Sequence, residues 1–272
     1  MKRNDRRGDQ EALTRLERVA DDLVGLAADP PEDFALRVLR HVGIRCERYD
    51  TYVRLRTPAG GLFVAAGPHA VTGAALDSAG LTATAFEELH RVRTRRSAVR
   101  ATKPFPGVLT ALRTGRARRL PVDLSGLTVT ERAVLETVRT IPPGQLRPVG
   151  WVAREAGAPE AAVTGALARN PVAVLVPSHR VTRDDGVPCD AGPLSGAGDA
   201  LRTAEGIDME RMAELHHDGV VFLGSDTTRV YCHPTCAHAR RIAPRHQVPF
   251  RTVREAGRAG YRPCKSCRPA AV

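Results

Sequence analysis

Apolar and polar residues recur along this chain with two different periods, and each period predicts one kind of element. An apolar residue every three or four positions predicts helices over 11–27, 31–42, 82–95, 105–114, 197–205 and 208–218. Strict alternation over 49–56, a Pro-Ala-Gly-Gly turn at 58–61 and an apolar run over 62–66 predict a β-hairpin. Because two strands alone are only marginally stable in water, we expect a helix or a third strand to pack on this hairpin.

Helix start and stop signals mark the centre of the chain. Thr128 and Glu131 have the spacing of a capping box, and Pro142-Pro143-Gly144 predicts the end of that helix near Thr140. Two further short helical patterns follow, joined by Gly-Ala-Pro at 157–159, and they have the form of a helix-turn-helix. The second is rich in small residues, which would let its backbone approach either a nucleic-acid groove or simply another part of the core.

Composition places the chain among ordinary globular proteins. Of its 272 residues, 42% are hydrophobic and 26% are charged, which argues against wholesale disorder. No run of eighteen apolar residues occurs, and MKRNDRRGDQ opens the chain with charges instead of an apolar signal segment. We therefore expect a soluble protein of the cytoplasm that has no membrane partner.

Positive charge is concentrated toward the C-terminal end. Residues 229–272 contain ten Arg and Lys against a single acid, Glu255, so they carry +9 of the formal net charge of +11. A small basic module beside a nearly neutral body predicts contact with a polyanion, and nucleic acid is the commonest such partner. The alternative is a solvated basic tail.

Four of the six cysteines are paired by their spacing. Cys232 and Cys236 form CxxxC, Cys264 and Cys267 form CxxC, and the other two stand alone. In an intracellular protein this pattern indicates a metal site, and four soft thiolates favour Zn2+ in a tetrahedral centre. Such zinc is usually structural, because a module of about fifty residues buries too small a core to be stable without a bound metal. Chemistry at this centre therefore requires a further argument.

The sequence around these cysteines supplies that argument by resemblance. The segment SDTTRVYCHPTC at 225–236, the basic segment ARRIAPRHQVPF and the ending AGYRPCKSCRP resemble the metal-binding domain of Ada, the bacterial alkylation-response protein. The resemblance implies that all four cysteines hold zinc and that Cys232 accepts a methyl group from a methylphosphotriester in the DNA backbone. A metal-bound thiolate stays deprotonated at neutral pH, which suits displacement at a methyl carbon. Methylation of one sulfur would also remove a negative charge and so favour DNA binding.

The stretch PSHRV at 177–181 has the outline of an active-site loop. A serine beside a histidine is one pattern of a nucleophile with its base, but neighbours in an extended segment point in opposite directions and no GxSxG pattern surrounds them. With RTIPPG at 139–144, the helix pair, ARNP at 168–171 and Glu205-Gly206, this stretch resembles the O6-alkylguanine-DNA alkyltransferase domain over about 49–206. In that family a cysteine of the loop accepts the alkyl group, and here Ser178 stands in its place.

Other positions also depart from the family pattern. The tyrosine that helps to rotate the base out of the duplex corresponds to Val149, the intercalating arginine falls in a gap before Val163, and the loop glycine-tyrosine becomes Asp190-Ala191. Because a hydroxyl is a poor nucleophile toward an alkyl carbon, we predict a degenerate pseudoenzyme domain without transfer to Ser178. Residues of the family's hinge and proton relay are retained: Asn170, His179, Arg180 and Glu205.

These resemblances imply an α+β fold in five segments. They are an N-terminal tail with helices (1–45), a β-rich, ribonuclease-H-like subdomain with the small hairpin or sheet (46–119), a helical, winged-helix-like alkyltransferase domain with the helix-turn-helix (120–206), a helical linker (207–222) and an Ada-type four-cysteine zinc domain (223–272). The expected DNA contacts lie in the second helix of the pair and in the zinc domain: Ala162, Thr164, Gly165, Arg169, Arg240, Arg241, Arg245, Lys265 and Arg268.

The leading hypothesis is a nucleoid-associated protein of the alkylation-damage response that binds alkylated double-stranded DNA. Cys232 would accept methyl groups as a stoichiometric methylated-DNA–protein-cysteine methyltransferase, whereas the alkylguanine site would be inactive. One alternative is a non-catalytic lesion sensor or transcriptional regulator with a structural zinc. Another is a pseudoenzyme that binds a protein partner and no longer meets DNA.

Overall fold

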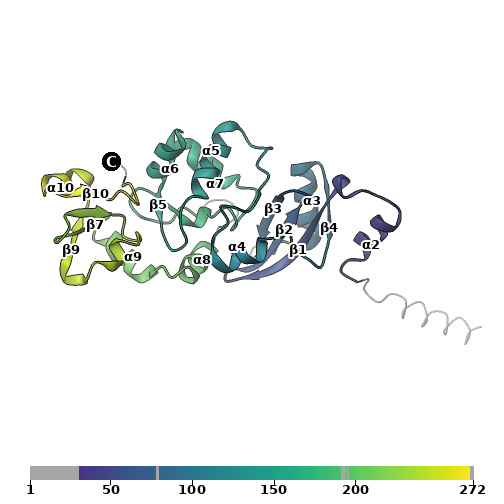
Figure 1. Cartoon of the computed structure of the whole chain (residues 1–272), viewed down its shortest axis with the longest axis horizontal. Helices are drawn as coiled ribbons and strands as arrows, with labels where there is room; N and C mark the ends of the chain where they lie inside the picture. Colours follow the sequence, from purple (N-terminus) through teal and green to yellow (C-terminus); the bar gives the residue numbers. More distant parts are fainter. Residues whose placement is uncertain (1–30, 78–79, 191–193, 195, 270–272) are drawn as a thin grey trace, which may run out of the picture.

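The structure is a computed structural model that describes residues 31–77, 80–190, 194 and 196–269. Figure 1 shows three parts in a row along the long axis: an N-terminal part with a sheet, a helical middle part and a small C-terminal part. This mixed α+β organisation confirms the expected fold class. The helix expected over 11–27 lies outside the described residues, and within them no helix is long and apolar enough to cross a bilayer.

The N-terminal part (residues 31–100) is built on a four-stranded sheet of which the expected hairpin is only one half. The strand order is β3-β2-β1-β4, with β4 parallel to β1 and the other pairs antiparallel. Local pattern does not predict β3 and β4, because the first is rich in Gly and Ala and the second has only four residues. The elements are α2 (Phe34–His41), η1 (Cys46–Arg48), β1 (Tyr49–Thr57), β2 (Gly60–Ala66), β3 (Val71–Leu76), α3 (Ala83–Thr94) and β4 (Ser97–Arg100).

Both faces of this sheet are buried, which explains why its strands carry large apolar residues on both sides. On one face Tyr52 packs on Phe86 of α3, with ring centroids 5.4 Å apart. On the other face Val53 joins the main core, which the sheet shares with the middle part. The Ala74 N–H donates to the Pro171 carbonyl at 2.9 Å, so the edge of the sheet is also tied to the middle part through backbone.

The middle part (residues 105–217) supplies most of the helices. The predicted capping box is confirmed, because the Thr128 hydroxyl accepts the Glu131 N–H and the Glu131 carboxylate accepts the Thr128 N–H at 2.8 Å. The turn between α6 and α7 begins at Gly157, whose φ of +63° suits glycine. The elements are α4 (Val108–Thr114), α5 (Val129–Val138), β5 (Arg147–Pro148), α6 (Val149–Ala156), α7 (Glu160–Ala168), η2 (Ser178–Arg180), β6 (Val181–Thr182), α8 (Gly198–Ala204) and α9 (Met209–His217).

The C-terminal part (residues 219–269) contains a second sheet in the order β10-β8-β7-β9. Its core is small and consists of Phe222, Tyr231, Phe250, Ala256 and Tyr261. A Cβ atom on Gly224 would lie 2.6 Å from the Phe250 ring, so this packing requires a glycine there. The elements are β7 (Phe222–Ser225), β8 (Val230–Cys232), η4 (Ala239–Arg241), η5 (Pro244–His246), β9 (Gln247–Phe250), α10 (Val253–Arg258) and β10 (Arg262–Pro263).

Candidate functional site

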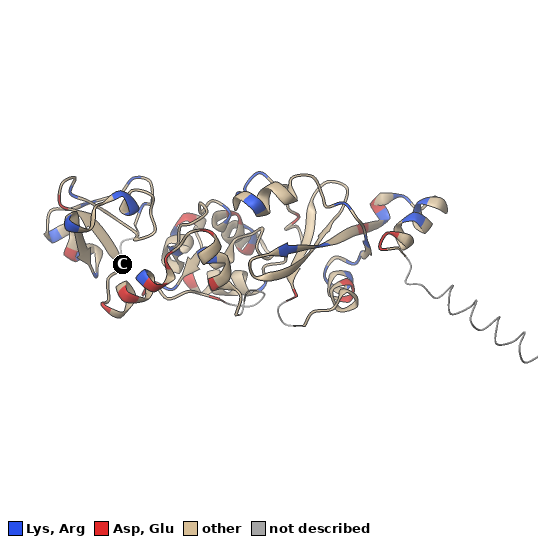
Figure 2. Cartoon of the chain, turned by 90° about the horizontal axis from the view of Figure 1, so that it is seen from below, with Lys and Arg blue, Asp and Glu red and all other residues tan. Residues whose placement is uncertain are grey.

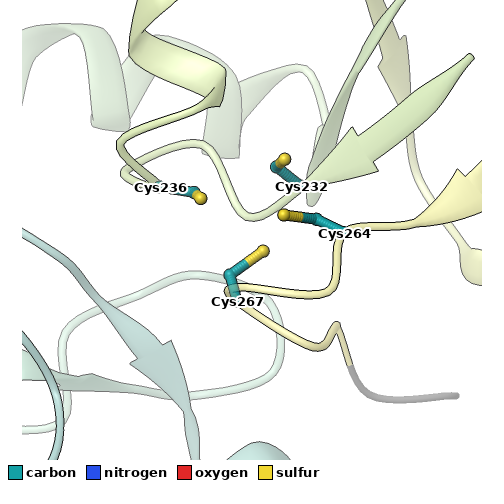
Figure 3. A group of neighbouring side chains, drawn as sticks. All are labelled: Cys232, Cys236, Cys264 and Cys267. Carbon is teal, nitrogen blue, oxygen red and sulfur yellow. The ribbon is translucent and has the colours of Figure 1, made fainter. Parts of the chain in front are cut away.

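Four cysteines meet at one end of the C-terminal sheet. Cys232 ends β8, Cys236 lies in the turn that follows, and Cys264 and Cys267 lie in the knuckle after β10. Their Sγ atoms all lie within 4.8 Å of one another, and each residue has at most 2% of its surface exposed. Figure 3 shows the four side chains converging from these separate segments.

The geometry and chemistry of this cluster fit a zinc ion. Tetrahedral Zn–S bonds of about 2.3 Å place sulfurs roughly 3.8 Å apart, and the four Sγ atoms lie within 4.8 Å of one another. The adjoining thiol of Cys232 lowers the pKa of Cys236, and hydrogen bonds from the backbone N–H groups of His238 and Ala239 lower it further. The sulfurs of Cys236 and Cys267, together with burial, raise the pKa of Cys232. A metal bound here would displace the remaining protons and hold all four sulfurs as thiolates.

Ser178 is buried in the middle part and is braced by an asparagine. Ser178 begins the 3-10 turn η2, so the extended conformation assumed from the sequence is wrong. Its Oγ accepts a hydrogen bond from Asn170 Nδ2 at 3.2 Å, and the same Nδ2 donates to the Val176 carbonyl at 3.0 Å. Asn170 Oδ1 in turn accepts the Val172 N–H at 3.0 Å. Asn170 therefore sets the path of the chain into the loop.

The residues that the alkyltransferase resemblance assigns to a proton relay lie together beside this loop. His179 Nε2 lies 3.0 Å from Glu205 Oε1, and Arg180 donates to the same carboxylate through Nε at 3.0 Å and Nη2 at 2.6 Å. Burial lowers the pKa of His179, so its imidazole is neutral at pH 7. Burial alone would raise the pKa of Glu205, but hydrogen bonds from His179 and Arg180 outweigh it and bring that pKa to about 2. In the described part of the chain no direct hydrogen bond joins His179 to Ser178, whose Oγ contacts Asn170 instead.

The low pKa of Glu205 predicts a specific acid dependence of stability. With a folded-state pKa of about 2 against an ordinary value of 4.5, its ion pair contributes fully above pH 4.5 and is lost as pH falls toward 2. We expect Glu205→Gln to remove this part of the acid dependence, as measured by urea unfolding at neutral pH and at steps between pH 4.5 and 2. Glu210→Gln, at an exposed position of α9, is the matched control and should keep it. Identical acid dependence in E205Q and the wild type would refute this assignment.

The helix pair presents the expected DNA contacts on one helix. Thr164 and Arg169 of the α7 region are exposed, whereas Ala162 and Gly165 are half-buried. Arg169 contacts the carboxylate of Glu131 through its Nε. Val149 begins α6 and is buried, so no aromatic ring stands at the position that the alkyltransferase resemblance assigns to a tyrosine. Contact between α7 and DNA stays a prediction.

The five basic residues of the C-terminal part that are expected to contact DNA fall into two groups. All five are exposed, and Figure 2 shows that basic residues outnumber acidic ones over this part. Arg240 and Arg268 in addition lie against the middle part, whereas Arg241, Arg245 and Lys265 form the second group. Arg240 lies beside Gly144, whereas Arg268 pairs with Glu155 of α6 at 2.5 Å. The sequence does not distinguish these two groups, because the distinction depends on how the parts dock, and a DNA contact remains a prediction for all five.

Sequence reasoning misses Thr235, Arg147 and Trp151, which lie where the middle and C-terminal parts meet. Thr235 Oγ1 accepts the Leu146 N–H at 2.7 Å. The guanidinium of Arg147 lies 5.6 Å from the centre of the Trp151 ring, and that of Arg268 lies 6.0 Å from the same ring. The available signal is the spacing of Arg147 and Trp151, the chain's only tryptophan, which stand four positions apart.

Two family models match adjoining parts of the chain. Residues 129–210 match the 6-O-methylguanine DNA methyltransferase, DNA binding domain, and residues 211–270 match the metal binding domain of Ada. The first range contains the Ser178 loop and its relay, and the second contains all four clustered cysteines.

Three proteins with similar sequences have names of the same kinds. The chain is 37% identical over 92 residues to a methylated-DNA–protein-cysteine methyltransferase of Methanothermobacter thermautotrophicus, covering 33% of this chain and 51% of that protein. It is 41% identical over 69 residues to the bifunctional transcriptional activator/DNA repair enzyme Ada of Escherichia coli, covering 25% of this chain and 19% of that protein. A DNA base-flipping protein of Thermus thermophilus is 40% identical over 67 residues, which cover 25% of this chain and 46% of that protein.

The matched segments span about half or less of these relatives. Among solved structures, that of Mycobacterium tuberculosis OGT in complex with DNA aligns at 25% identity with a TM-score of 0.45, covering 61% of this chain and 98% of that one. By the two family models, a segment that matches the 6-O-methylguanine DNA methyltransferase, DNA binding domain lies directly before a segment that matches the metal binding domain of Ada.

Proposed function

We propose that this chain is a protein of the DNA alkylation-damage response in which Cys232 accepts a methyl group from a methylphosphotriester of the DNA backbone, while Ser178 accepts none. The observation that carries the proposal is the buried four-cysteine cluster inside the segment that matches the Ada metal-binding domain. Zinc bound there would keep the sulfurs as thiolates at neutral pH.

Resemblance supports Cys232 as the acceptor among the four cysteines. Cys232 is the first cysteine of the pattern and ends β8 inside the segment that matches the Ada metal-binding domain. The resemblance assigns the methyl acceptor to this position, and a metal-bound thiolate is a suitable nucleophile toward an alkyl carbon.

The proposed reaction is a single displacement. Cys232 Sγ attacks the methyl carbon in line with the ester oxygen, the S–C bond forms, and the C–O bond breaks. The phosphodiester anion leaves with the electron pair, so no proton needs to move. Exposed Arg241, Arg245 and Lys265 would hold the neighbouring phosphates, since cationic side chains supply most of the affinity for a DNA backbone.

The Ser178 loop supports the second half of the proposal. Its hydroxyl is held by Asn170, and its neighbour His179 is turned to Glu205. A serine becomes a useful nucleophile only when a base takes its proton. The middle part would then bind DNA without accepting an alkyl group.

One tryptic digest tests both halves of the proposal. Full-length protein is incubated with duplexes that carry either a methylphosphotriester or O6-methylguanine, and an unmethylated duplex serves as the control. Trypsin leaves Cys232 and Cys236 together in one peptide (230–240). It places the other residues in separate peptides: Cys264 in 259–265, Cys267 in 266–272 and Ser178 in 170–180. We expect a gain of about 14 Da, one methyl for one proton, on Cys232 with the phosphotriester duplex alone. Methyl on the 170–180 peptide, or no methyl on Cys232, would contradict the proposal.

The burial of Cys232 favours a second candidate function, in which zinc is only structural and the chain senses lesions without transferring methyl groups. Cys232 is 1% exposed, so a phosphate reaches its sulfur only if the surrounding residues move. The similarity to a protein named a DNA base-flipping protein also supports this candidate. A sensor would bind methylated duplex more tightly than unmethylated duplex and leave all four cysteine peptides unchanged in mass.

A further inference from the structure

Among the residues that the structure describes, a buried arginine without a carboxylate partner lies where the middle and C-terminal parts meet. Arg147 is 3% exposed. Its Nη1 donates to the Leu146 carbonyl at 2.7 Å and its Nη2 donates to Gln145 Oε1 at 2.6 Å, and within the described residues its Nε has no partner. An arginine keeps its charge in a protein, and a buried charge that meets only neutral groups is strongly unfavourable. The charge of Arg147 therefore requires a source of negative potential.

The cysteine cluster supplies that potential. Burial lowers the pKa of Arg147, and the thiolates of all four cysteines, Cys267 first, act on it in the opposite direction. Residues next to the cysteines contact Leu146, which precedes Arg147, and Trp151, whose ring Arg147 covers. Thr235, which adjoins Cys236, accepts the Leu146 N–H at 2.7 Å, and Arg268, which adjoins Cys267, shares the Trp151 ring with Arg147. Arg154 of the middle part also donates to the carbonyl of Arg268, the residue after Cys267, at 2.7 Å.

We propose that Arg147 is the buried counter-cation of the four-cysteine zinc centre and that it couples this centre to the DNA-binding middle part. Zn2+ with four thiolates carries a net charge of about −2, and a guanidinium held nearby in a low-dielectric interior stabilises that charge strongly. The coupling has a direct route into the middle part, because Arg147 of β5 pairs with Val181 of β6, the residue that follows the Ser178–Arg180 turn. The inference rests on the proposed zinc centre but not on methyl transfer to Cys232.

Zinc release from the full-length, zinc-loaded protein tests the role of the charge. The metal is transferred to an excess of a chromogenic chelator, and the release rate is compared between the wild type, Arg147→Met, Arg147→Lys and Arg154→Met. We expect release about tenfold faster in R147M and within about threefold of the wild type in R147K, because lysine keeps the charge. Arg154 lies in the same interface and donates to the Arg268 carbonyl at 2.7 Å, but its side chain is 41% exposed. R154M should therefore release zinc at nearly the wild-type rate.

A second experiment monitors the contact between the middle and C-terminal parts in the wild-type protein, so it does not require a variant that folds. Trp151 is the only tryptophan, so its fluorescence reports on this contact. In the wild type, zinc removal should shift the Trp151 emission and accelerate hydrogen exchange at the Leu146 amide, while the Val172 amide, bonded to Asn170 at 3.0 Å, stays protected. Three results would overturn the inference. They are a zinc-release rate of R147M equal to that of the wild type, equal release rates of R147M and R154M, and hydrogen exchange at the Leu146 amide that does not change when zinc is removed. Failure of methyl transfer with these results intact would refute only the proposed reaction.

Discussion

Removing zinc, or replacing Cys264 with serine, should unfold the C-terminal part while the other two parts stay folded. The core of this part consists of five residues, and its strands have two to four residues each, so burial alone supplies little stability. Structural zinc contributes about 10–16 kcal/mol in small zinc-binding peptides, more than such a core can replace. We therefore expect a metal held by the four buried sulfurs to be the main support of this fold.

Metal analysis and native-state hydrogen exchange would measure this effect. In C264S we expect loss of bound zinc and of amide protection over 222–263, with protection over 49–76 retained. Cys46→Ser is the matched control, because Cys46 is exposed and lies outside the cluster. A C264S protein that keeps amide protection over 222–263 would show that the metal is dispensable for folding.

Replacing Arg180 with leucine should destabilise the middle part by about 3–5 kcal/mol, because it leaves the carboxylate of Glu205 buried without its main partner. The guanidinium of Arg180 also donates to the Ile141 carbonyl at 2.7 Å and to the Gly115 carbonyl at 2.6 Å. These bonds join α4, the end of α5 and the Glu205 turn around η2, so a single side chain holds several segments together. Urea unfolding followed by circular dichroism would give the change.

Arg183 provides the matched control three positions away. Its side chain is 61% exposed and lies 3.6 Å from Asp185, which is 52% exposed, so this ion pair is screened by solvent. Arg183→Leu should therefore change the free energy of unfolding by less than about 1 kcal/mol. Equal losses in R180L and R183L would show that the buried network contributes no more than a surface pair.

The local pattern of apolar and polar residues predicts those helices and strands whose turn and capping residues lie close together in the sequence. The hairpin of β1 and β2 follows from alternation around a turn, and α5 follows from the Thr128–Glu131 capping box. The cysteine spacing likewise predicts the metal cluster, because two close pairs can supply a tetrahedral donor set wherever the chain folds back on itself. The family resemblance, in turn, placed His179 and Glu205 in one relay, and the structure brings them within 3.0 Å.

Other features depend on contacts between distant segments, which no local window contains. Strands β4 and β8 are only four and three residues long, and they exist because a longer or better-buried neighbour pairs with them. The turn at Ser178 depends on Asn170, whose amide reaches across it.

The sequence by itself predicted the class of fold and the cluster of four cysteines, and it places a serine at position 178, because residue identity and short-range spacing carry that information. Only the tertiary structure decided which charges are buried and which are free for a partner. It packs the C-terminal part on the middle part through a hydrogen bond between Leu146 and Thr235, 89 positions apart. That docking pairs Arg268 with Glu155 of α6 and joins Leu146, next to Arg147, to Thr235, next to Cys236, since electrostatic environment depends on distance in space and not on distance along the chain.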